Sequence, residues 1–413
     1  MTMGGDHGPI VDPLRDRLDV RTQLSGTRLL VLGGTGFLGK VWLSMVLHHF
    51  PEVGHVFLVV RPKKKNGKTT LDSAARFWAE VVPSPVFDPV RERFPGGAFE
   101  AMIRDKVTVV PGDVTEAFAG VPKKDRDRMR GSLHAIVNVA GVVEFNPPLD
   151  HSLNVNAFGM QNLVDLAQDL GEGGALGVPF LHTSTAYVAG GRTGEVLEVD
   201  PRAHPFPRAN ELDRSHWEPE REIAECVDLV ESVRHRSSDA FRQSAFLAQA
   251  KENLKAKGEP GRGSALDDEL AKVKRRFEEK QLIEWGTERA QYWGWHNIYT
   301  YTKSIGEQIL ARSGVPYVIA RPAVIESALR YPKEGWNEGI NTSAPLIYLA
   351  MKGPSLYPKE EETCLDIIPV DQVAVGMILT LAELLEGTSK PVYHYGSSDT
   401  NGLKVNRLIE LVG

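Results

Sequence analysis

The sequence predicts an α/β protein built on a doubly wound parallel sheet, with a helical insertion and a smaller C-terminal substrate-binding part. Two observations support this prediction. Short apolar runs alternate with helical patterns along most of the chain, and a glycine-rich segment follows the first of these runs. With 413 residues, of which 42% are hydrophobic, the chain is long enough to bury a large core in one big or two ordinary domains.

Composition argues against several classes of protein. The 48 basic and 54 acidic residues give a net charge of −6, which argues against a nucleic-acid partner. Cys226 and Cys364 have no spacing typical of metal ligands, so we expect neither a disulfide framework nor a metal site, in a reducing, cytoplasmic setting. No run approaches the ~20 apolar residues that span a bilayer. Peripheral contact with a membrane surface stays open.

Changes in pattern divide the chain into four segments. The first has no apolar centre, so it is neither a signal peptide nor an anchor, and we expect a flexible leader. A core, a helical insertion and a last segment with the remaining core strands follow. Their bounds are 1–25 for the leader, 26–190 for the core, 191–297 for the insertion and 298–413 for the last segment.

The glycine-rich segment is typical of a dinucleotide-binding, Rossmann-type turn. An apolar strand pattern at 28–32 precedes it, and a buried helix pattern follows at 41–47. Gly33 permits a tight turn, Gly36 lets the backbone approach a pyrophosphate, and Gly39 lets helix and strand pack closely. A glycine-rich surface turn is the alternative, but it does not need the flanking strand and helix. We expect cofactor contacts from Gly33, Thr35, Gly36, Phe37, Leu38 and Gly39.

The second strand indicates which dinucleotide would bind. The apolar run 56–60 ends at Arg61, where an NAD enzyme would place an acidic residue for the ribose 2′-hydroxyl. A basic residue, backed by Lys63, instead suits the 2′-phosphate of NADP. The alternative is a solvated basic turn. Beyond it, the pattern predicts a helix over 70–82 and an irregular connection over 83–98.

Hydroxyl side chains gather at the end of the strand predicted from residue 180. Ligands of doubly wound folds lie outside the carboxyl ends of strands, so Thr183, Ser184 and Thr185 are candidates for contact with substrate. A plain strand end is the alternative. We expect His182 to be buried and not catalytic.

A tyrosine and a lysine four residues apart complete the pattern. Tyr299 and Lys303 would lie on one helix face, where the ammonium lowers the pKa of the phenol so that it can give a proton to a carbonyl oxygen. Tyr348 and Lys352 have the same spacing. Chain order favours Tyr299, because it follows the hydroxyl-bearing strand and precedes the strand over 317–321.

The insertion contains two charged helical patterns, at about 218–257 and 265–292, separated by a glycine-rich turn. They predict either a solvated helical hairpin or a lid or docking surface beside the active site. After the catalytic helix, we expect the backbone at Pro322, Ala323 and Val324 to meet the nicotinamide.

Later segments are expected to form the substrate pocket. Asp366 and Asp371 flank a strand end, with helix capping the safer role for Asp371, and an apolar helix follows over 373–385. A helical pattern that starts near Lys404 still continues at Gly413, so we expect a longer natural polypeptide.

In this order, the motifs resemble those of an extended short-chain dehydrogenase/reductase and, more closely, a fatty acyl-CoA reductase. Leu32, where a Thr is common, Ala323, where a Ser is common, and the longer insertion depart from the family pattern. The segments that carry the resemblance are 34–41, 61–63, 182–188, 299–303, 321–322 and 366–371.

The resemblance implies further site residues. Thr185 would hydrogen-bond the substrate carbonyl, with Ser184 as the fallback, and Asn156 would kink its helix and hold a water behind Lys303. Asp113 and Val114 would border the adenine, although Asp113 could equally cap a helix. Ala140, followed by Gly141, would let the cofactor pass over the sheet.

The implied reaction is NADPH-dependent reduction of a long-chain acyl-CoA, through a bound aldehyde, to a primary alcohol. Thr185 and Tyr299 would stabilise the oxyanion, and Lys303 would orient the nicotinamide ribose. Three alternatives stay open: a reductase of acyl chains bound to a carrier protein, a nucleotide-sugar epimerase or dehydratase, and a non-catalytic NADP-binding regulator. Arg61 and the long connection before Tyr299 disfavour the second, and the intact Thr/Tyr/Lys set disfavours the third.

Overall fold

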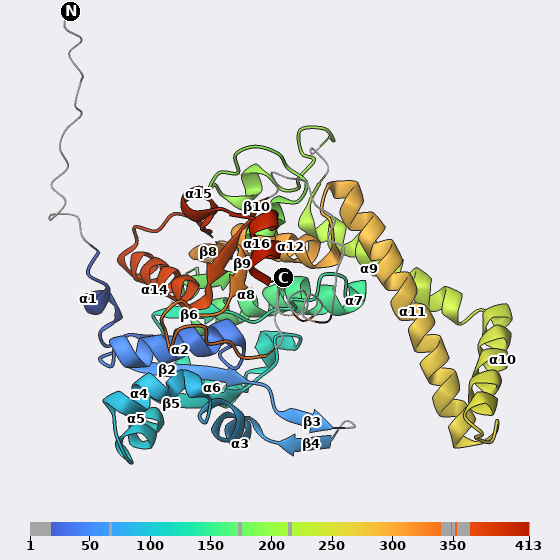
Figure 1. The fold of residues 1–413 in the computed structure, drawn as a ribbon, viewed down its shortest axis with the longest axis horizontal. Coiled ribbons are helices and arrows are strands. Elements are labelled where there is room, and N and C mark those ends of the chain that lie inside the picture. The colour runs from blue at the N-terminus through green and yellow to red at the C-terminus, as the bar shows by residue number, and fades with distance from the viewer. Residues whose placement is uncertain are drawn as a thin grey trace, which may run out of the picture.

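A computed structural model describes residues 18–65, 68–171, 176–213, 217–339 and 364–412, together with Tyr348 and Lys352. Its centre is a seven-stranded sheet in the order β12-β8-β7-β6-β1-β2-β5 (Figure 1), with every neighbouring pair parallel. The predicted doubly wound parallel sheet is therefore confirmed. The strands are β1 (Arg28–Leu32), β2 (His55–Val60), β5 (Val107–Pro111), β6 (Ala135–Asn138), β7 (Phe180–Thr183), β8 (Tyr317–Pro322) and β12 (Val392–Tyr395).

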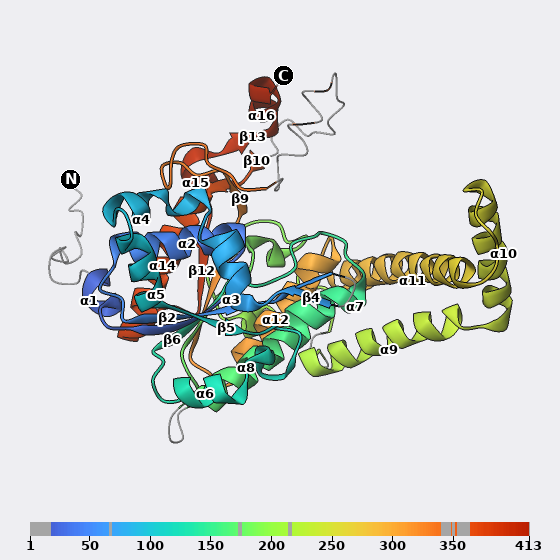
Figure 2. The ribbon, with the colours of Figure 1, turned by 90° about the horizontal axis from the view of Figure 1, so that it is seen from below.

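Two helical layers cover the sheet because its strands are apolar on both faces. In β1, Leu29 and Val31 pack into the core on one side, whereas Leu30 and Leu32 pack into the core on the other. Figure 2 shows the two layers. The first contains α1 (Val20–Leu24), α2 (Phe37–His49), α3 (Ser73–Arg76), α4 (Asp88–Arg93), α5 (Ala98–Lys106) and α14 (Val370–Glu386), and the second α6 (Lys123–Met129), α7 (Leu149–Ser152), α8 (Phe158–Leu170) and α12 (Ile298–Arg312).

Two local predictions between β2 and β5 were wrong. The predicted helix over 70–82 begins only at α3, after a hairpin of β3 (Lys63–Lys65) and β4 (Lys68–Leu71), and it continues as a π-helical turn over Phe77–Val81. Asp72 starts α3 by accepting the Ala75 N–H at 2.7 Å. The connection predicted to be irregular contains α4, because Pro89 in its first turn is compatible with a helix start.

The predicted flexible leader is wrong for its last part, whereas residues 1–17 lie outside the described part of the chain. Asp19 caps α1, with its carboxylate accepting the Thr22 N–H at 3.1 Å. Leu24 is fully buried in the core beside α14. An apolar anchor therefore fixes this helix to the sheet domain.

The insertion forms an arm, residues 219–293, that extends away from the sheet (Figures 1 and 2). It contains α9 (Pro219–Ser237), α10 (Ala240–Ala256) and α11 (Ser264–Trp293). The first helical pattern was expected to run unbroken over 218–257, but it breaks at Ser238. Asp239 starts a new helix there by accepting the Phe241 N–H at 2.8 Å.

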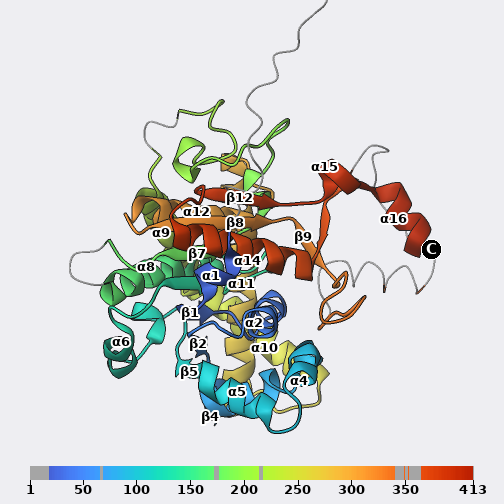
Figure 3. The same ribbon diagram turned by 90° about the vertical axis from the view of Figure 1, so that its left-hand side faces the viewer.

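A small C-terminal part projects from the edge of the sheet (Figure 3). Its strands pair outside the main sheet, β9 with β11 and β10 with β13. Within the ranges given above, no helix is both long and apolar enough to span a bilayer. The elements of this part are β9 (Val324–Glu326), β10 (Cys364–Leu365), β11 (Ile367–Pro369), α15 (Ser398–Asn401), β13 (Leu403–Lys404) and α16 (Val405–Val412).

Candidate active site

The glycine turn joins β1 to α2 and leaves no room for side chains. Gly33 has φ of +81°, and a Cβ there would lie 2.5 Å from the backbone nitrogen of Ala140. A Cβ on Gly39 would lie 2.3 Å from the Gly33 carbonyl oxygen. Close packing therefore requires both glycines and brings Ala140 beside the turn. Thr35, Phe37 and Leu38 lie in the turn and the first turn of α2, whose free N–H groups can bind an anion.

Arg61 and Asp113 line one pocket of about 510 Å³ at the carboxyl ends of β2 and β5. The guanidinium of Arg61 lies 3.9 Å from the Asp113 carboxylate. Lys63 also lines the pocket, where it pairs with Glu80. Asp113 caps its own turn by accepting the Thr115 N–H at 3.0 Å, so it has a structural contact as well as a place in the pocket.

Val114 follows Asp113 in the chain, and its backbone carbonyl accepts a hydrogen bond from the Asn162 side chain of α8 at 2.8 Å. Its side chain packs near Gly159, where a Cβ would lie 3.4 Å from it. The structure thus places Val114 between the turn at Asp113 and α8.

Thr185 and Tyr299 meet at the carboxyl end of β7. Asn297 caps α12 by accepting the Thr300 N–H at 2.9 Å, which places Tyr299 in the first turn of the helix. The Tyr299 hydroxyl shares a hydrogen bond with Thr185. Thr185 in turn accepts the Tyr187 N–H at 3.3 Å. Two hydroxyl groups from separate parts of the chain are therefore positioned as a pair that can donate to one carbonyl oxygen.

Lys303 follows one turn later on α12 and is buried. Its ammonium donates to the Thr183 carbonyl at 2.9 Å. A Cβ on Gly141 would lie 2.8 Å from that ammonium and 3.5 Å from the side-chain oxygen of Asn156. Gly141, Lys303 and Asn156 thus lie together, and a side chain at 141 would require the lysine ammonium to move.

Asn156 lies in a π-helical turn, Leu153–Ala157, between α7 and α8. Its amide donates to Thr302 at 3.0 Å, and its carbonyl oxygen accepts the Val142 N–H at 3.3 Å. The helical segment begins with α7, before this turn. The irregular turn lets Asn156 connect α12 to the loop after β6.

The pKa of Tyr299 differs from the value expected for a tyrosine beside Lys303. Burial raises the pKa of Tyr299 to about 12, partly opposed by the hydrogen bond with Thr185, so the predicted lowering by Lys303 is not found. Burial also lowers the pKa of Lys303 to about 8, opposed by Glu307. The lysine ammonium points to Thr183 and does not contribute to the tyrosine's shift. Tyr299 is therefore a protonated hydrogen-bond donor at neutral pH.

The chain after β8 closes the site from the other side. The Thr185 hydroxyl lies 3.5 Å from the Pro322 carbonyl. Ala323 donates to the Tyr395 carbonyl at 2.8 Å, and Val324 donates to the Asp366 carbonyl at 3.1 Å. The backbone predicted to meet the nicotinamide therefore lies beside the hydroxyl pair.

Other candidates lie elsewhere or have structural contacts. The ammonium of Lys352 lies over the ring of Tyr348, 5.1 Å from its centroid, and Tyr348 is exposed. His182 is buried against Asn138 at 3.1 Å, and burial, with the nearby Lys303 charge, holds its pKa well below the usual value. Asp371 accepts the N–H groups of residues 329–331 and so caps a loop.

The residues present fit a dinucleotide. The glycine turn packs against Ala140 too closely for side chains. The Arg61 pocket lies at the carboxyl ends of β2 and β5, the same edge of the parallel sheet at which Lys303 contacts the end of β7. The buried hydroxyl of Ser184 has no hydrogen-bond partner within the described residues, which marks a polar group that a ligand or water could satisfy.

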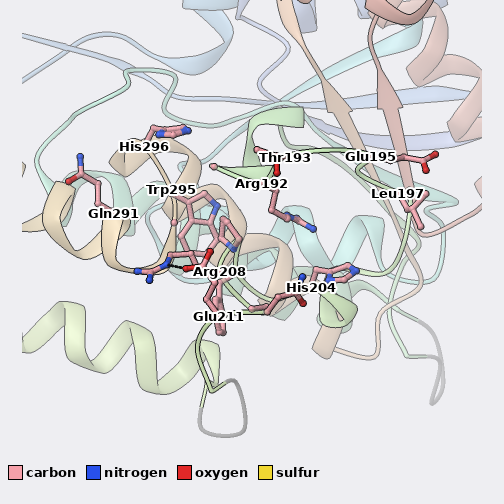
Figure 4. A pocket seen from close by; sticks show the side chains of 16 residues that line it. Arg192, Thr193, Glu195, Leu197, His204, Arg208, Glu211, Gln291, Trp295 and His296 are labelled. Atoms are coloured by element: carbon pink, nitrogen blue, oxygen red, sulfur yellow. Dashed lines mark hydrogen bonds and ion pairs between the residues drawn. The ribbon is translucent and has the colours of Figure 1, made fainter.

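Sequence reasoning missed several groups around the site. Val143 and Phe145 lie in the loop after β6, and the Phe145 carbonyl accepts the Tyr299 N–H at 3.1 Å. Two apolar residues on either side of Glu144, in the loop that follows β6, were the available signal. A cavity of about 540 Å³ was also missed (Figure 4). It lies between the loop after β7 and the segment that joins α11 to α12, and its lining includes Arg192, His204 and Arg208.

A parallel sheet with a glycine turn at one strand end and a buried Thr/Tyr/Lys set at another defines an NAD(P)-binding reductase of the short-chain dehydrogenase type. Comparison with known proteins then identifies the family. A family model described as "Male sterility protein" matches residues 31–377, and the chain belongs to this family. In the described residues, no three His, Cys, Asp or Glu side chains are grouped as metal ligands would be.

The chain is similar to curated fatty acyl-CoA reductases over most of its length. It is 30% identical to "Probable fatty acyl-CoA reductase 5" of Arabidopsis thaliana, with 94% of this chain and 70% of the relative covered. It is 29% identical to "Alcohol-forming fatty acyl-CoA reductase" of Simmondsia chinensis, with the same coverage. It is 24% identical to "Fatty acyl-CoA reductase 2" of Homo sapiens, with 91% and 59% covered.

Solved structures support the fold. A thiolation-reductase di-domain from an archaeal non-ribosomal peptide synthetase has a TM-score of 0.52 at 15% identity, covering 94% of this chain and 74% of its own. The reductase domain of a non-ribosomal peptide synthetase from Mycobacterium tuberculosis has the same TM-score at 16% identity, with 95% and 73% covered. At this identity the likeness concerns the fold alone.

Proposed function

We propose that this protein reduces long-chain fatty acyl-CoA to a fatty alcohol, through a bound aldehyde, with NADPH. The observation that carries the proposal is the hydrogen-bonded pair of Thr185 and Tyr299 beside buried Lys303, in a chain similar to fatty acyl-CoA reductases. The pair can hold one carbonyl oxygen, as reduction of a thioester and then of an aldehyde both require.

Residues of this chain would have separate roles in the proposed reaction. Thr185 and Tyr299 would donate hydrogen bonds to the oxygen on which negative charge develops, and Tyr299 would deliver the proton that completes the alcohol. Lys303 would bind the nicotinamide ribose, and Asn156 would hold the helix turn that supports the lysine. The reduced nicotinamide supplies the hydride. The turn from Gly33 to Gly39 would bind the pyrophosphate, and residues 322–324 would contact the nicotinamide.

The Arg61 pocket supports NADPH over NADH. Arg61 and Lys63 line it beside the carboxyl end of β2, where a 2′-phosphate would lie. Asp113 is 3.9 Å from Arg61, and its carboxylate could accept from the adenosine part. A guanidinium binds phosphate through paired, charge-assisted hydrogen bonds, so the preference would be electrostatic.

A carrier-protein thioester is the second candidate substrate. The likeness of the fold to reductase domains of peptide synthetases favours it. The same hydroxyl pair would serve, because the reacting group is again a thioester carbonyl.

The test is oxidation of NADPH with palmitoyl-CoA, with NADH in parallel and with the product identified. Two NADPH per CoA released, with hexadecanol as product, is the expected result. One NADPH per CoA with free aldehyde would reduce the proposal to two-electron chemistry. No oxidation with palmitoyl-CoA, but turnover of an acyl carrier protein, would select the second candidate.

Tyr299→Phe is expected to lower kcat by about 100-fold or more, since it removes the proton donor. Binding of NADPH, followed by quenching of protein fluorescence, should stay within about threefold of the original, because the hydroxyl points to Thr185. Tyr348→Phe is the matched control, because it removes a hydroxyl with the same spacing to a lysine. Equal loss of NADPH binding in Tyr299→Phe would contradict the assigned role.

A further inference from the structure

Three side chains with apolar surface are exposed in the segments that contact or follow Thr185 and Tyr299 in the structure: Phe145 contacts Tyr299, Val143 precedes Phe145 by two residues, and Tyr187 contacts Thr185. In the described part of the chain, the exposed fraction is 76% for Val143, 64% for Phe145 and 43% for Tyr187. Burying such side chains is favourable, and apolar surface beside polar catalytic groups marks a place where a ligand is expected to cover it. We therefore expect a ligand to cover these side chains.

Hydrogen bonds connect Phe145 and Tyr187 to the two residues that carry the catalytic hydroxyl groups, and Val143 lies two residues before Phe145. The Phe145 carbonyl accepts the Tyr299 N–H at 3.1 Å, and the two rings have centroids 6.5 Å apart. The Tyr187 N–H donates to the Thr185 hydroxyl at 3.3 Å. A carbonyl group held by Thr185 and Tyr299 would therefore have its substituents close to Phe145 and Tyr187.

A thioester carbonyl has two substituents, and only one of them is apolar throughout. The group attached to the sulfur carries amides and phosphates, whereas the group attached to the carbonyl carbon is a hydrocarbon chain. Val143 and Phe145 offer no hydrogen-bonding side chain, and the exposed Glu144 between them would repel phosphate. The hydrocarbon chain is the occupant that this surface suits.

Tyr187 is amphipathic in the same place. Its ring is partly exposed, while its hydroxyl lies near Asp366 and Cys364 of the C-terminal part, and burial, then the negative Asp366, raises its pKa. The Tyr187 hydroxyl group therefore keeps its proton, and it lies on the side of the C-terminal part. The face of the ring is left for apolar contact.

We propose that Val143, Phe145 and Tyr187 bind the hydrocarbon chain next to the reacting carbonyl and make the enzyme selective for long over short acyl groups. This inference rests on the proposed acyl thioester substrate. It assigns chain selectivity to the loop after β6 and to the turn after Thr185, and it leaves oxyanion binding to the hydroxyl pair.

The test compares acyl chain lengths in Phe145→Ala and in a Val143→Ser/Phe145→Ala double variant. Steady-state rates are measured with butyryl-CoA and with palmitoyl-CoA below its micelle concentration, at saturating NADPH. For palmitoyl-CoA, kcat/KM should fall by about 10- to 100-fold, as expected when a ring and a branched side chain lose apolar burial. For butyryl-CoA it should change less than about threefold, because few carbons reach the surface.

Phe241→Ala on the arm is the matched control, since Phe241 is 83% exposed and belongs to α10, away from the hydroxyl pair. It should leave both rates unchanged. An equal loss for both chain lengths in Phe145→Ala would overturn the proposal, because it would show a role in positioning Tyr299. An unchanged preference for palmitoyl-CoA would also overturn it.

A binding measurement separates this inference from the proposed function. Calorimetry of palmitoyl-CoA and of CoA, each with NADP⁺ present, reports chain binding without turnover. If the original protein binds palmitoyl-CoA more tightly than CoA but does not oxidise NADPH, the proposed reaction fails. The inference still stands if Phe145→Ala removes that difference, and it falls if the difference persists.

Discussion

Lys303 is the residue of the candidate site whose titration lies within the usual assay range. Burial lowers its pKa to about 8, whereas the pKa of Tyr299 is raised to about 12. As pH rises through 8 the lysine loses its charge while the tyrosine keeps its proton. We therefore expect kcat/KM to fall above pH 8, and the falling limb reports the lysine and not the phenol.

Lys303→Met tests this assignment. The variant should be slower by about 100-fold or more, and its kcat/KM should no longer fall between pH 7.5 and 9.5. A profile measured from pH 6 to pH 10 in buffers of constant ionic strength is the measurement. If the limb near pH 8 persists in the variant, another group controls it.

Arg61 should determine the choice between the two nicotinamide cofactors. Arg61→Ala is expected to raise KM for NADPH by about 10-fold or more, because a charge-assisted hydrogen bond to phosphate is lost. KM for NADH should hardly change, since NADH has no 2′-phosphate. Lys123→Ala, which removes an exposed cation paired with Asp127 on α6, is the control. A parallel loss with NADH would assign Arg61 a general role in folding or binding.

The sequence named most of the candidate residues but not their contacts. Glycines and the Tyr/Lys spacing have recognisable chemistry, so positions 33–39, 299 and 303 could be selected from local patterns, whereas the family resemblance selected Thr185 from the hydroxyl cluster. The π-helical turn that directs Asn156 at Thr302 has no local signature, because it depends on how α7 and α8 pack against α12. The raised pKa of Tyr299 depends on burial, which spacing alone does not determine.

At the scale of elements, the base of the arm is joined to the catalytic helix through a buried carboxylate. Glu222 of α9 accepts hydrogen bonds from Tyr301 of α12, from Trp293 at 2.9 Å and from Arg289 of α11 at 2.7 and 2.8 Å. Tyr301 lies two residues from Tyr299. Three helices thus share one ionic centre, and movement of the arm base would be felt in α12.

Glu222→Gln is expected to lower the free energy of unfolding by about 1–3 kcal/mol, because the Arg289 guanidinium then keeps only Glu225 as an anionic partner. Turnover should fall as well, since Tyr301 helps to fix the helix that carries Tyr299. Urea unfolding followed by circular dichroism is the measurement, with Glu231→Gln as control. Glu231 pairs with Arg234 on the exposed face of α9, so that change should stay within about 0.5 kcal/mol. Equal effects of the two changes would refute the role of the buried centre.

The strands were easier to predict than the helix boundaries. Residues 28–32 and 56–60 form strands that are buried on both faces, so they appear in the sequence as continuous apolar runs. The predicted helix start at 70 failed because β4 pairs with β3, a contact between segments that propensity does not report. The break before α10 was visible as Asp239, a helix-capping residue that the charged pattern on both sides obscured.

At the scale of the whole molecule, the arm has an inner part joined to α12 and an outer part with a small core of its own. In the outer part α10 packs mainly on α11, with the rings of Phe246 and Phe277 5.3 Å apart. Ser237 at the end of α9 hydrogen-bonds Glu278 of α11, so the two helices are adjacent where the outer part begins. The outer part can therefore be removed without separating the ends that remain.

Replacing residues 239–277 by a short glycine-serine linker should keep the sheet domain folded and NADPH binding intact. The thermal midpoint is expected to move by less than about 4 °C, because the Glu222 centre and the packing of α12 are retained. If the outer arm only contacts a partner, turnover of palmitoyl-CoA in solution stays unchanged, and this is the outcome we expect. Loss of turnover with NADPH binding preserved would instead show that the outer arm acts as a lid over the acyl site.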